Sequence, residues 1–199
     1  EECISLNDTF QKKLKEDAEQ TFSRCAAPLA KFAVDKSIPP LKLDFMDGKK
    51  MPPPRHYRVP QHLLPELRKF VQEMVEKGWI SKSRSPFSSP VLVIRKPGNR
   101  GYRFVVDFSG TVNPITKTLN HHILDVNEMW DKLREAKYKS SLDLKHGFWL
   151  AALDEESRPY TAFSTPFGHF EYNCVPMGLC QSSAYFQNFV ETKLRRNGI

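Results

Sequence analysis

The sequence of 199 residues predicts an α+β protein, in which helices and strand pairs follow one another unevenly. Two stretches have apolar residues at helical spacing, and two apolar stretches are broken by tight turns and are typical of β-hairpins. Hydrophobic residues make up 40% and charged residues 27%, as in globular domains. No apolar run approaches the roughly 18 residues of a membrane span, so we expect no such span.

Residues 1–50 are predicted to form a helical extension followed by a proline-rich connector. Phe10, Leu14, Ala18 and Phe22 recur at near-helical spacing over the first 35 residues. The six prolines within residues 35–60 exclude a helix and favour an extended chain. Within the connector, LKLDF at 41–45 is a candidate edge strand.

An apolar stripe predicts a helix that begins at Gln61 and ends at Gly78. The stripe consists of Leu63, Leu64, Leu67, Phe70, Val71, Met74 and Val75. Residues 90–108 then form two apolar runs around a Pro-Gly-Asn turn, which predicts a hairpin.

The second half of the chain contains four further predicted elements. We expect an amphipathic helix over 124–136 and a strand that leads to Asp143. Residues 160–176 are predicted to form a hairpin with its turn near Gly168. The last element is a helix that begins with Ser182 as its cap and ends before Gly198.

The net charge of +7 is concentrated in one part of the sequence. Seven basic residues and no acidic residue lie between positions 77 and 103: Lys77, Lys82, Arg84, Arg95, Lys96, Arg100 and Arg103. Such a block suits a phosphate backbone, although a solvated protein face is an equally good interpretation of charge alone.

Cysteine and histidine spacing excludes the common zinc sites, because the sequence has no Cys-x-x-Cys pair. Four scattered cysteines do not form a disulfide framework, so we expect reduced thiols in an intracellular protein of unspecified compartment. The chain begins at Glu1 without a basic and apolar leader, so we expect no signal peptide.

Asp143 lies between Leu142 and Leu144 at the end of the predicted strand. Aspartate is depleted in strands, and a buried unpaired carboxylate is costly. One interpretation is a ligand to Mg²⁺, which protein carboxylates hold together with substrate phosphates. The other is a strand-end cap or a surface ion pair, because carboxylates are common and two-metal sites are rare.

Residues 51–108 and 140–190, which include "SRSPFSSPVLVIRKPGNRGYRFVVDF" and "LDLKHGFW … VPMGLCQSSAYFQ", together resemble the reverse transcriptases of gypsy-type LTR retrotransposons and, more distantly, of retroviruses. The resemblance implies the fingers of a right-hand polymerase and the first half of a ferredoxin-like palm. It implies fingers at 51–117 and 151–181, palm at 118–150, and a palm helix at 182–199.

The resemblance also implies roles for individual residues. Asp143 and the backbone carbonyl of Leu144 would bind catalytic Mg²⁺ or Mn²⁺. Lys96, Arg103 and the backbone of His146 and Gly147 would bind the dNTP phosphates, with Phe148 as a steric gate beneath the sugar. Template contacts are implied for Met177, Gly178 and Gln187, with Phe186 on the same helix as Gln187. The basic fingers patch would comprise Lys82, Arg84, Arg95 and Arg100.

Three departures from the family pattern stand out. Ser109 occupies the position of an arginine, Ser183 that of a proline, and the Tyr-x-Asp-Asp motif occurs nowhere in the sequence. Since a two-metal site needs more than one carboxylate, we expect this chain alone not to polymerise DNA.

Three functions therefore stay open. The chain is the amino-terminal part of an RNA-directed DNA polymerase, with the remaining palm and thumb supplied in cis or by a partner chain. Alternatively, it is a domesticated fragment that serves as a structural or docking subunit of a larger assembly. In the third interpretation, it is a module that binds an RNA template and DNA primer duplex without chemistry.

Overall fold

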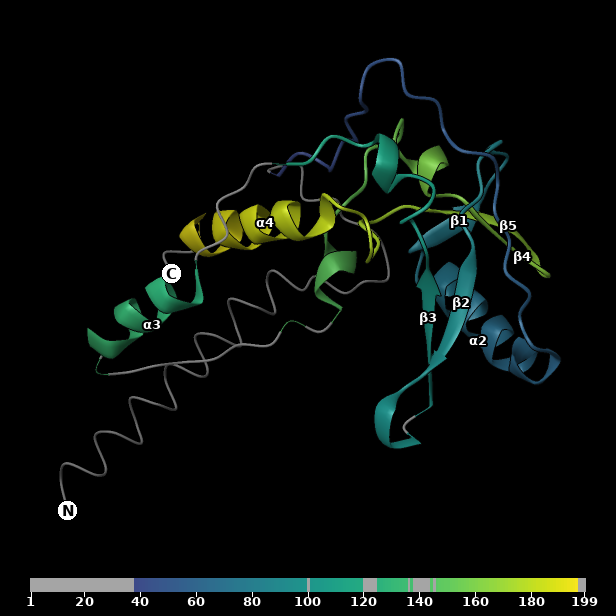
Figure 1. Ribbon diagram of the computed structural model, residues 1–199. Coiled ribbons are helices and arrows are strands. Elements are labelled where there is room, and N and C mark those ends of the chain that lie inside the picture. Colours follow the sequence, from purple (N-terminus) through teal and green to yellow (C-terminus); the bar gives the residue numbers. More distant parts are fainter. Residues whose placement is uncertain are drawn as a thin grey trace.

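The computed structural model describes residues 38–99, 101–119, 125–135, 137, 144 and 146–196. The predicted helix in the first 35 residues, the strand that leads to Asp143, and Arg100 lie outside the described residues. The rest forms two antiparallel sheets, three α-helices and several short 3₁₀ helices (Figure 1).

The helix predicted from Gln61 to Gly78 is confirmed. A 3₁₀ turn, η1 (Gln61–Leu63), leads into α2 (Leu64–Glu76), whose Leu67, Val71 and Met74 are buried. The helix stops because Gly78 adopts φ +69°, a conformation that glycine accepts without strain. Val75 is 45% exposed, so the buried stripe is narrower than predicted.

The basic hairpin is also confirmed. Strands β2 (Val91–Arg95) and β3 (Tyr102–Val106) pair antiparallel across the turn η2 (Pro97–Asn99). The backbone N–H of Lys96 donates a 2.8 Å hydrogen bond to the carbonyl of Gly101, which extends the ladder towards the tip.

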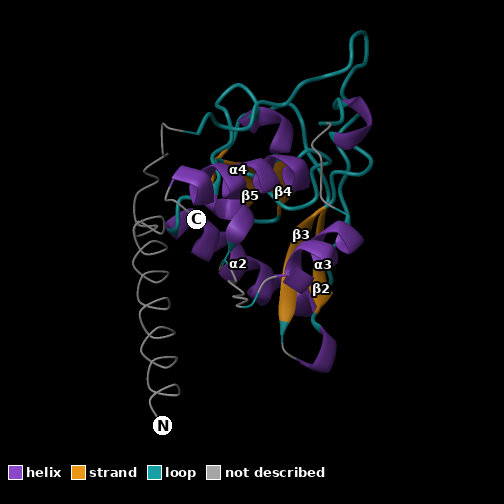
Figure 2. Ribbon diagram, turned by 90° about the vertical axis from the view of Figure 1, so that its left-hand side faces the viewer, coloured by secondary structure: helices purple, strands orange, loops and turns teal. Residues whose placement is uncertain are grey.

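The second sheet contains three strands in the order β1-β5-β4 (Figure 1). Figure 2 shows β4 and β5 behind helix α4 in that view. Strands β4 (Phe163–Thr165) and β5 (Gly168–Tyr172) form the hairpin predicted around Gly168. Strand β1 (Ile80–Lys82) pairs with β5 and thus joins residues about 90 positions apart in the sequence. Nothing in the sequence indicated β1, because its three residues directly follow a helix.

The proposed edge strand at 41–45 does not form. Leu41 makes an isolated parallel bridge with Leu153, and Phe45 an isolated antiparallel bridge with Thr116. Since the two ends pair with different segments in opposite directions, no ladder develops between them.

The core brings these elements together. Its largest fully buried side chains include Trp79, Phe108, Phe163, Leu67 and Leu153. Phe104 on β3 contacts both Phe163 (ring centroids 5.4 Å apart) and Phe70 on α2 (6.4 Å), so the basic hairpin and α2 belong to one packed body.

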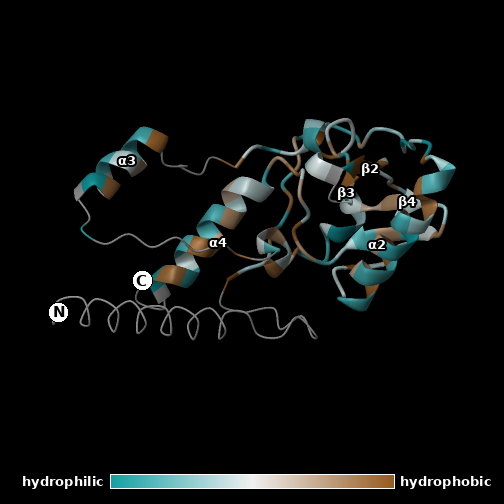
Figure 3. Ribbon diagram, turned by 90° about the horizontal axis from the view of Figure 1, so that it is seen from below, coloured by the Kyte–Doolittle hydropathy of each residue, from teal (hydrophilic) through white to brown (hydrophobic). Residues whose placement is uncertain are grey.

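Two more helices complete the description: α3 (Val126–Glu135) and α4 (Ser182–Arg196). Helix α3 stands apart from both sheets, and its apolar stripe faces solvent (Figures 1 and 3). The exposed side chains are Val126, Met129, Trp130 and Leu133. Among the described helices, none is long and apolar enough to cross a membrane.

Candidate functional site

The basic hairpin presents cations on both of its faces. Arg103 is paired across the ladder with Ile94 and is exposed. Because side chains alternate along a strand, Lys96 points to the same face as Arg103, and Arg95 points to the other. Lys82 on β1 and Arg84 just after it are also exposed. The hairpin therefore separates the predicted phosphate-gripping pair from Arg95.

The His146 segment forms a tight turn before the 3₁₀ helix η4 (Gly147–Leu150). His146 adopts a left-handed conformation with φ 58°, which is uncommon for a residue with a side chain. Its ring stacks on Trp149, at 5.4 Å and 5° between planes, and lies 5.1 Å from the buried ring of Trp79. These ring contacts hold the strained turn in place.

In this turn, two backbone groups that are predicted to bind ligands form a hydrogen bond with each other. The backbone N–H of Gly147 donates a 3.2 Å hydrogen bond to the carbonyl of Leu144. The resemblance assigns the first group to a triphosphate and the second to a metal ion. If both roles operate, this hydrogen bond weakens or opens when nucleotide and metal bind.

Phe148 packs against α4. Its ring lies 4.8 Å from that of Phe186, which in turn stacks 6.2 Å from Phe189. A Cβ atom on Gly147 would lie 2.7 Å from Phe186 Cζ, so no side chain fits at position 147 without moving this ring. Glycine thereby brings the turn directly onto the α4 aromatic residues.

The loop at 176–181, which precedes α4, contains the predicted template residues Met177 and Gly178. Met177 is 57% exposed, and Gly178 has φ +96°, which favours glycine. The Asn113 side chain holds this loop from two sides: its Nδ2 donates to the Gly178 carbonyl at 2.8 Å, and its Oδ1 accepts from the Cys180 N–H at 2.9 Å.

Two further side chains fix the junction between this loop and α4. Gln181 is fully buried and donates from Nε2 to the carbonyl of Lys117 at 2.5 Å. The Ser182 hydroxyl donates to the Pro176 carbonyl at 2.7 Å, so this serine ties the helix start to the loop. Gln187, a predicted template residue, lies one turn further along α4 and donates to Glu191 at 2.8 Å.

Ser109, at the arginine position of the family pattern, forms hydrogen bonds with the carboxylate of Asp107. Its hydroxyl and N–H both donate to Asp107 Oδ1, at 2.5 and 2.9 Å, and the Tyr57 hydroxyl donates to Oδ2 at 3.3 Å. These hydrogen bonds, those from Ser109 first, lower the pKa of Asp107, with a smaller contribution from the charge of Arg55.

The metal ligands are only partly visible. Asp143 lies outside the described residues, and among those described no cluster of three His, Cys, Asp or Glu side chains could hold a metal ion. A carboxylate and a carbonyl are hard oxygen donors that suit Mg²⁺, provided water and substrate phosphates supply the remaining ligands. This pair fits one such ion and is too small a set for two.

Sequence reasoning missed Asn113 and Gln181 as positioning residues. Asn113 and its partner Gly178 are 65 residues apart in the sequence, and Gln181 and its partner Lys117 are 64 apart. No local sequence pattern therefore connects these residues. Cys174 and Cys180 are free thiols, the first buried and the second exposed, and burial raises the pKa of both.

Comparison with known proteins assigns this arrangement to a family. Residues 49–197 match the family described as reverse transcriptase (RNA-dependent DNA polymerase). The chain belongs to that family, and the predicted resemblance is confirmed.

Among its relatives is the retrovirus-related Pol polyprotein from transposon 297 of Drosophila melanogaster, 40% identical over 65% of this chain and 13% of that protein. The enzymatic polyprotein of cauliflower mosaic virus (strain NY8153) is 35% identical over 65% of this chain and 19% of its own length. The chain thus spans less than a fifth of these two relatives.

The fold is shared with solved structures of the same class. The foamy viral protease-reverse transcriptase in complex with an RNA/DNA hybrid aligns with 80% of this chain and 21% of its own, with a TM-score of 0.68 and 26% identity. The α+β polymerase fold predicted from the sequence is therefore confirmed.

Proposed function

We propose that this chain provides the nucleotide-gripping and template-contacting part of an RNA-directed DNA polymerase. In the complete reaction, a primer 3′-hydroxyl attacks the α-phosphate of a dNTP and pyrophosphate leaves. The chain's own share is to position substrates: Lys96 and Arg103 hold phosphates, and the 176–181 loop supports the template base.

The observation that carries this proposal is the fixed geometry of two segments: the 176–181 loop, which leads into α4, and the His146 turn, which contacts α4. Asn113 and Gln181 hold the loop, while Gly147 and Phe148 meet α4 through Phe186. Two predicted template residues, Met177 and Gly178, thus directly precede α4, and the predicted sugar-contacting ring of Phe148 packs on Phe186 of the same helix. Positioning of this kind is a major part of phosphoryl-transfer catalysis.

We propose further that the chain does not polymerise by itself. When bound by Asp143 and the Leu144 carbonyl, Mg²⁺ would neutralise charge on the triphosphate. A lone carboxylate does not fix both ions of a two-metal site, and the sequence contains no Tyr-x-Asp-Asp.

A binding titration tests the positioning role. We expect the chain to bind a blunt RNA/DNA hybrid with a salt-dependent affinity, because Lys96 and Arg103 displace counterions from phosphates. The double variant Lys96→Ala/Arg103→Ala should bind about tenfold more weakly with a shallower salt slope. The control Arg134→Ala removes an exposed cation of α3, and equal affinity of the double variant and wild type would contradict the proposal.

A docking role is the second candidate, and the exposed stripe of α3 favours it. Val126, Met129, Trp130 and Leu133 form one continuous apolar face at helical spacing. Stable co-purification with a protein assembly that survives nuclease treatment and is lost in Trp130→Lys would support docking over nucleic-acid binding.

A further inference from the structure

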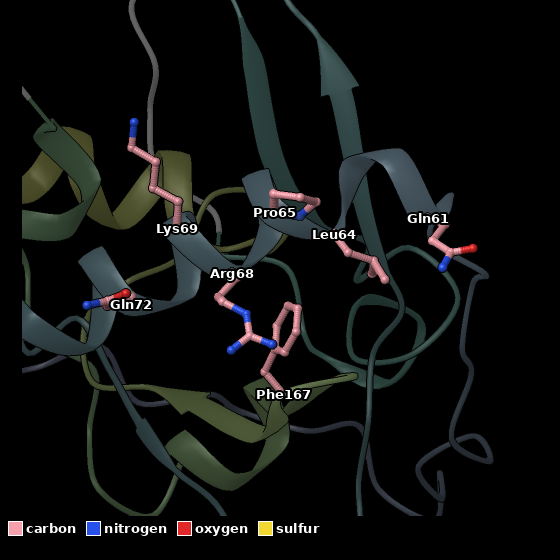
Figure 4. Close-up of a pocket in the computed structure, with 7 residues that line it drawn as sticks. All are labelled: Gln61, Leu64, Pro65, Arg68, Lys69, Gln72 and Phe167. Carbon is pink, nitrogen blue, oxygen red and sulfur yellow. The ribbon is translucent and has the colours of Figure 1, made fainter.

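A pocket of about 450 Å³ lies between α2 and the β4–β5 turn, away from the residues assigned above (Figure 4). Leu64, Arg68 and Gln72 are spaced by four residues and share one face of the helix, with Lys69 beside them. Phe167, from the turn, forms the opposite wall. Most lining side chains of α2 are exposed, so the pocket opens directly to solvent.

The pocket contains a preformed stack of a cation on a ring. The Arg68 guanidinium lies 4.3 Å from the centroid of the Phe167 ring. Figure 4 shows the two groups next to each other. The turn holds this ring in place, because the Phe167 N–H donates to Thr165 Oγ1 at 3.2 Å and that hydroxyl donates to the Gly168 carbonyl at 3.1 Å. The guanidinium therefore has one face on a fixed ring while its side chain stays exposed.

The lining carries two positive charges and no negative charge. Neither Arg68 nor Lys69 forms an ion pair within the described part of the chain, in contrast to Lys77, which pairs with Glu73 on the same helix. Two cations beside an aromatic ring suit a ligand with both phosphates and planar rings. A nucleobase can stack on the guanidinium or the ring while adjacent phosphates contact Arg68 and Lys69.

The position of the pocket favours a nucleic-acid strand over a free nucleotide. The same helix packs through Phe70 against Phe104 of the basic hairpin, and the neighbouring β1 carries the exposed Lys82. Arg68 and Lys69 thus belong to the same packed body as the hairpin cations, although α2 also carries Glu66, Glu73 and Glu76. A strand with repeated phosphates can contact both sets of cations, which a single nucleotide cannot. The open pocket would enclose only a small part of a lone nucleotide.

We infer that the Arg68–Phe167 pocket binds an unpaired strand of RNA or DNA, as a site separate from the residues that hold the dNTP and the template base. This inference rests on the proposed function, because it assumes a chain that works on nucleic acid. Stacking is tolerant of sequence, so the site should not discriminate strongly between bases.

Fluorescence anisotropy with a labelled oligo(dT) or oligo(rU) of about twelve nucleotides tests the inference, since single-strand sites of this type span roughly 4–16 nucleotides. We expect Arg68→Gln and Phe167→Ala each to weaken binding about tenfold, as loss of one stacked base predicts. Phe167→Trp should keep the affinity, and its added indole fluorescence should be quenched by the strand. Arg134→Ala, which removes another exposed arginine, on α3, should leave the affinity unchanged.

A parallel titration with the blunt RNA/DNA hybrid separates this inference from the proposed function. The inference alone would be overturned by the following combination of results. Hybrid binding depends on Lys96 and Arg103, Arg68→Gln leaves single-strand binding unchanged, and the strand does not quench the fluorescence of Phe167→Trp. Failure of the wild-type chain to bind either nucleic acid would overturn both. Equal losses in Arg68→Gln and Arg134→Ala, or a polyglutamate peptide that binds wild type but not Phe167→Ala, would also overturn it.

Discussion

Asn113 is the residue on which the geometry of the 176–181 loop most depends. One amide side chain both donates to the Gly178 carbonyl and accepts from the Cys180 N–H. Gly178 needs this support, because its φ of +96° is held by tertiary contacts rather than by regular secondary structure. The family resemblance identified the loop residues, whereas the side chain that positions them became visible only in the folded chain.

Replacement of Asn113 tests this role. We expect Asn113→Ala to lower the free energy of unfolding by about 1–2 kcal/mol, because two partly exposed hydrogen bonds are lost. It should also weaken hybrid binding through the freed loop. Urea unfolding and the anisotropy titration measure the two effects. Asn127→Ala on the exposed face of α3 is the control, and equal behaviour of the two variants would argue against a positioning role.

Gly147 offers a test of the contact between the His146 turn and α4. In Gly147→Ala the added methyl would collide with Phe186, which lies 2.7 Å from the ideal Cβ position. We expect a loss of about 1–3 kcal/mol, typical of overpacking. The double variant Gly147→Ala/Phe186→Leu should recover part of it in thermal unfolding, and an undiminished loss would show that the collision is not the cause.

The lowered pKa of Asp107 predicts that the stability of the fold depends on pH. Its pKa is lowered in the fold, so its stabilising effect is present above the unfolded value of about 3.9 and is lost as the pH falls through the folded pKa. Ser109→Ala removes the main hydrogen bond that lowers this pKa.

We therefore expect wild type to exceed Ser109→Ala in stability by less than about 1 kcal/mol near neutral pH, because the carboxylate is largely solvated. The difference should shrink as the pH falls below about 4 and through the lowered folded pKa of Asp107, because protonation of this carboxylate in wild type removes the stabilising effect. Urea unfolding across this range measures it. A difference that grows on acidification would contradict this account.

At the scale of elements, local pattern predicted well wherever contacts are local. The helix at 61–77 and both hairpins follow from spacing and turn residues close together in the sequence. Strand β1 and the bridges of Leu41 and Phe45 depend on partners more than 70 residues away, which no local pattern identifies. The predicted fold class is therefore confirmed, whereas the predicted edge strand at 41–45 is wrong.

Helix α3 differs from the core in what its apolar residues contribute. Trp130 is 61% exposed, whereas Phe163 is fully buried among other rings. We expect Trp130→Lys to change the free energy of unfolding by less than about 0.5 kcal/mol and Phe163→Ala to lower it by about 3–5 kcal/mol. Chemical denaturation of both variants measures this. A cost of 2 kcal/mol or more, roughly the value of burying one large apolar side chain, for Trp130→Lys would mean that α3 packs against other parts of the chain.

At the scale of the whole molecule, the chain combines a basic hairpin, a strained turn and a clamped loop within one reverse transcriptase fold. It covers only 21% of the foamy viral chain that it resembles. The residues of the candidate site come from motif order, because the resemblance carries residue positions directly, and their roles remain predictions. The hydrogen bond from the Gly147 N–H to the Leu144 carbonyl was not predicted, since it depends on backbone geometry that residue identity does not specify.

Primer extension tests the central claim most directly, namely that this chain positions substrates but lacks the carboxylates for two-metal chemistry. A labelled DNA primer on an RNA template is incubated with Mg²⁺ and all four dNTPs, at a protein concentration that saturates the hybrid in the anisotropy titration. The account predicts a bound but unextended primer. An extended product that disappears in Asp143→Asn would contradict it, because a single carboxylate motif would then suffice for catalysis.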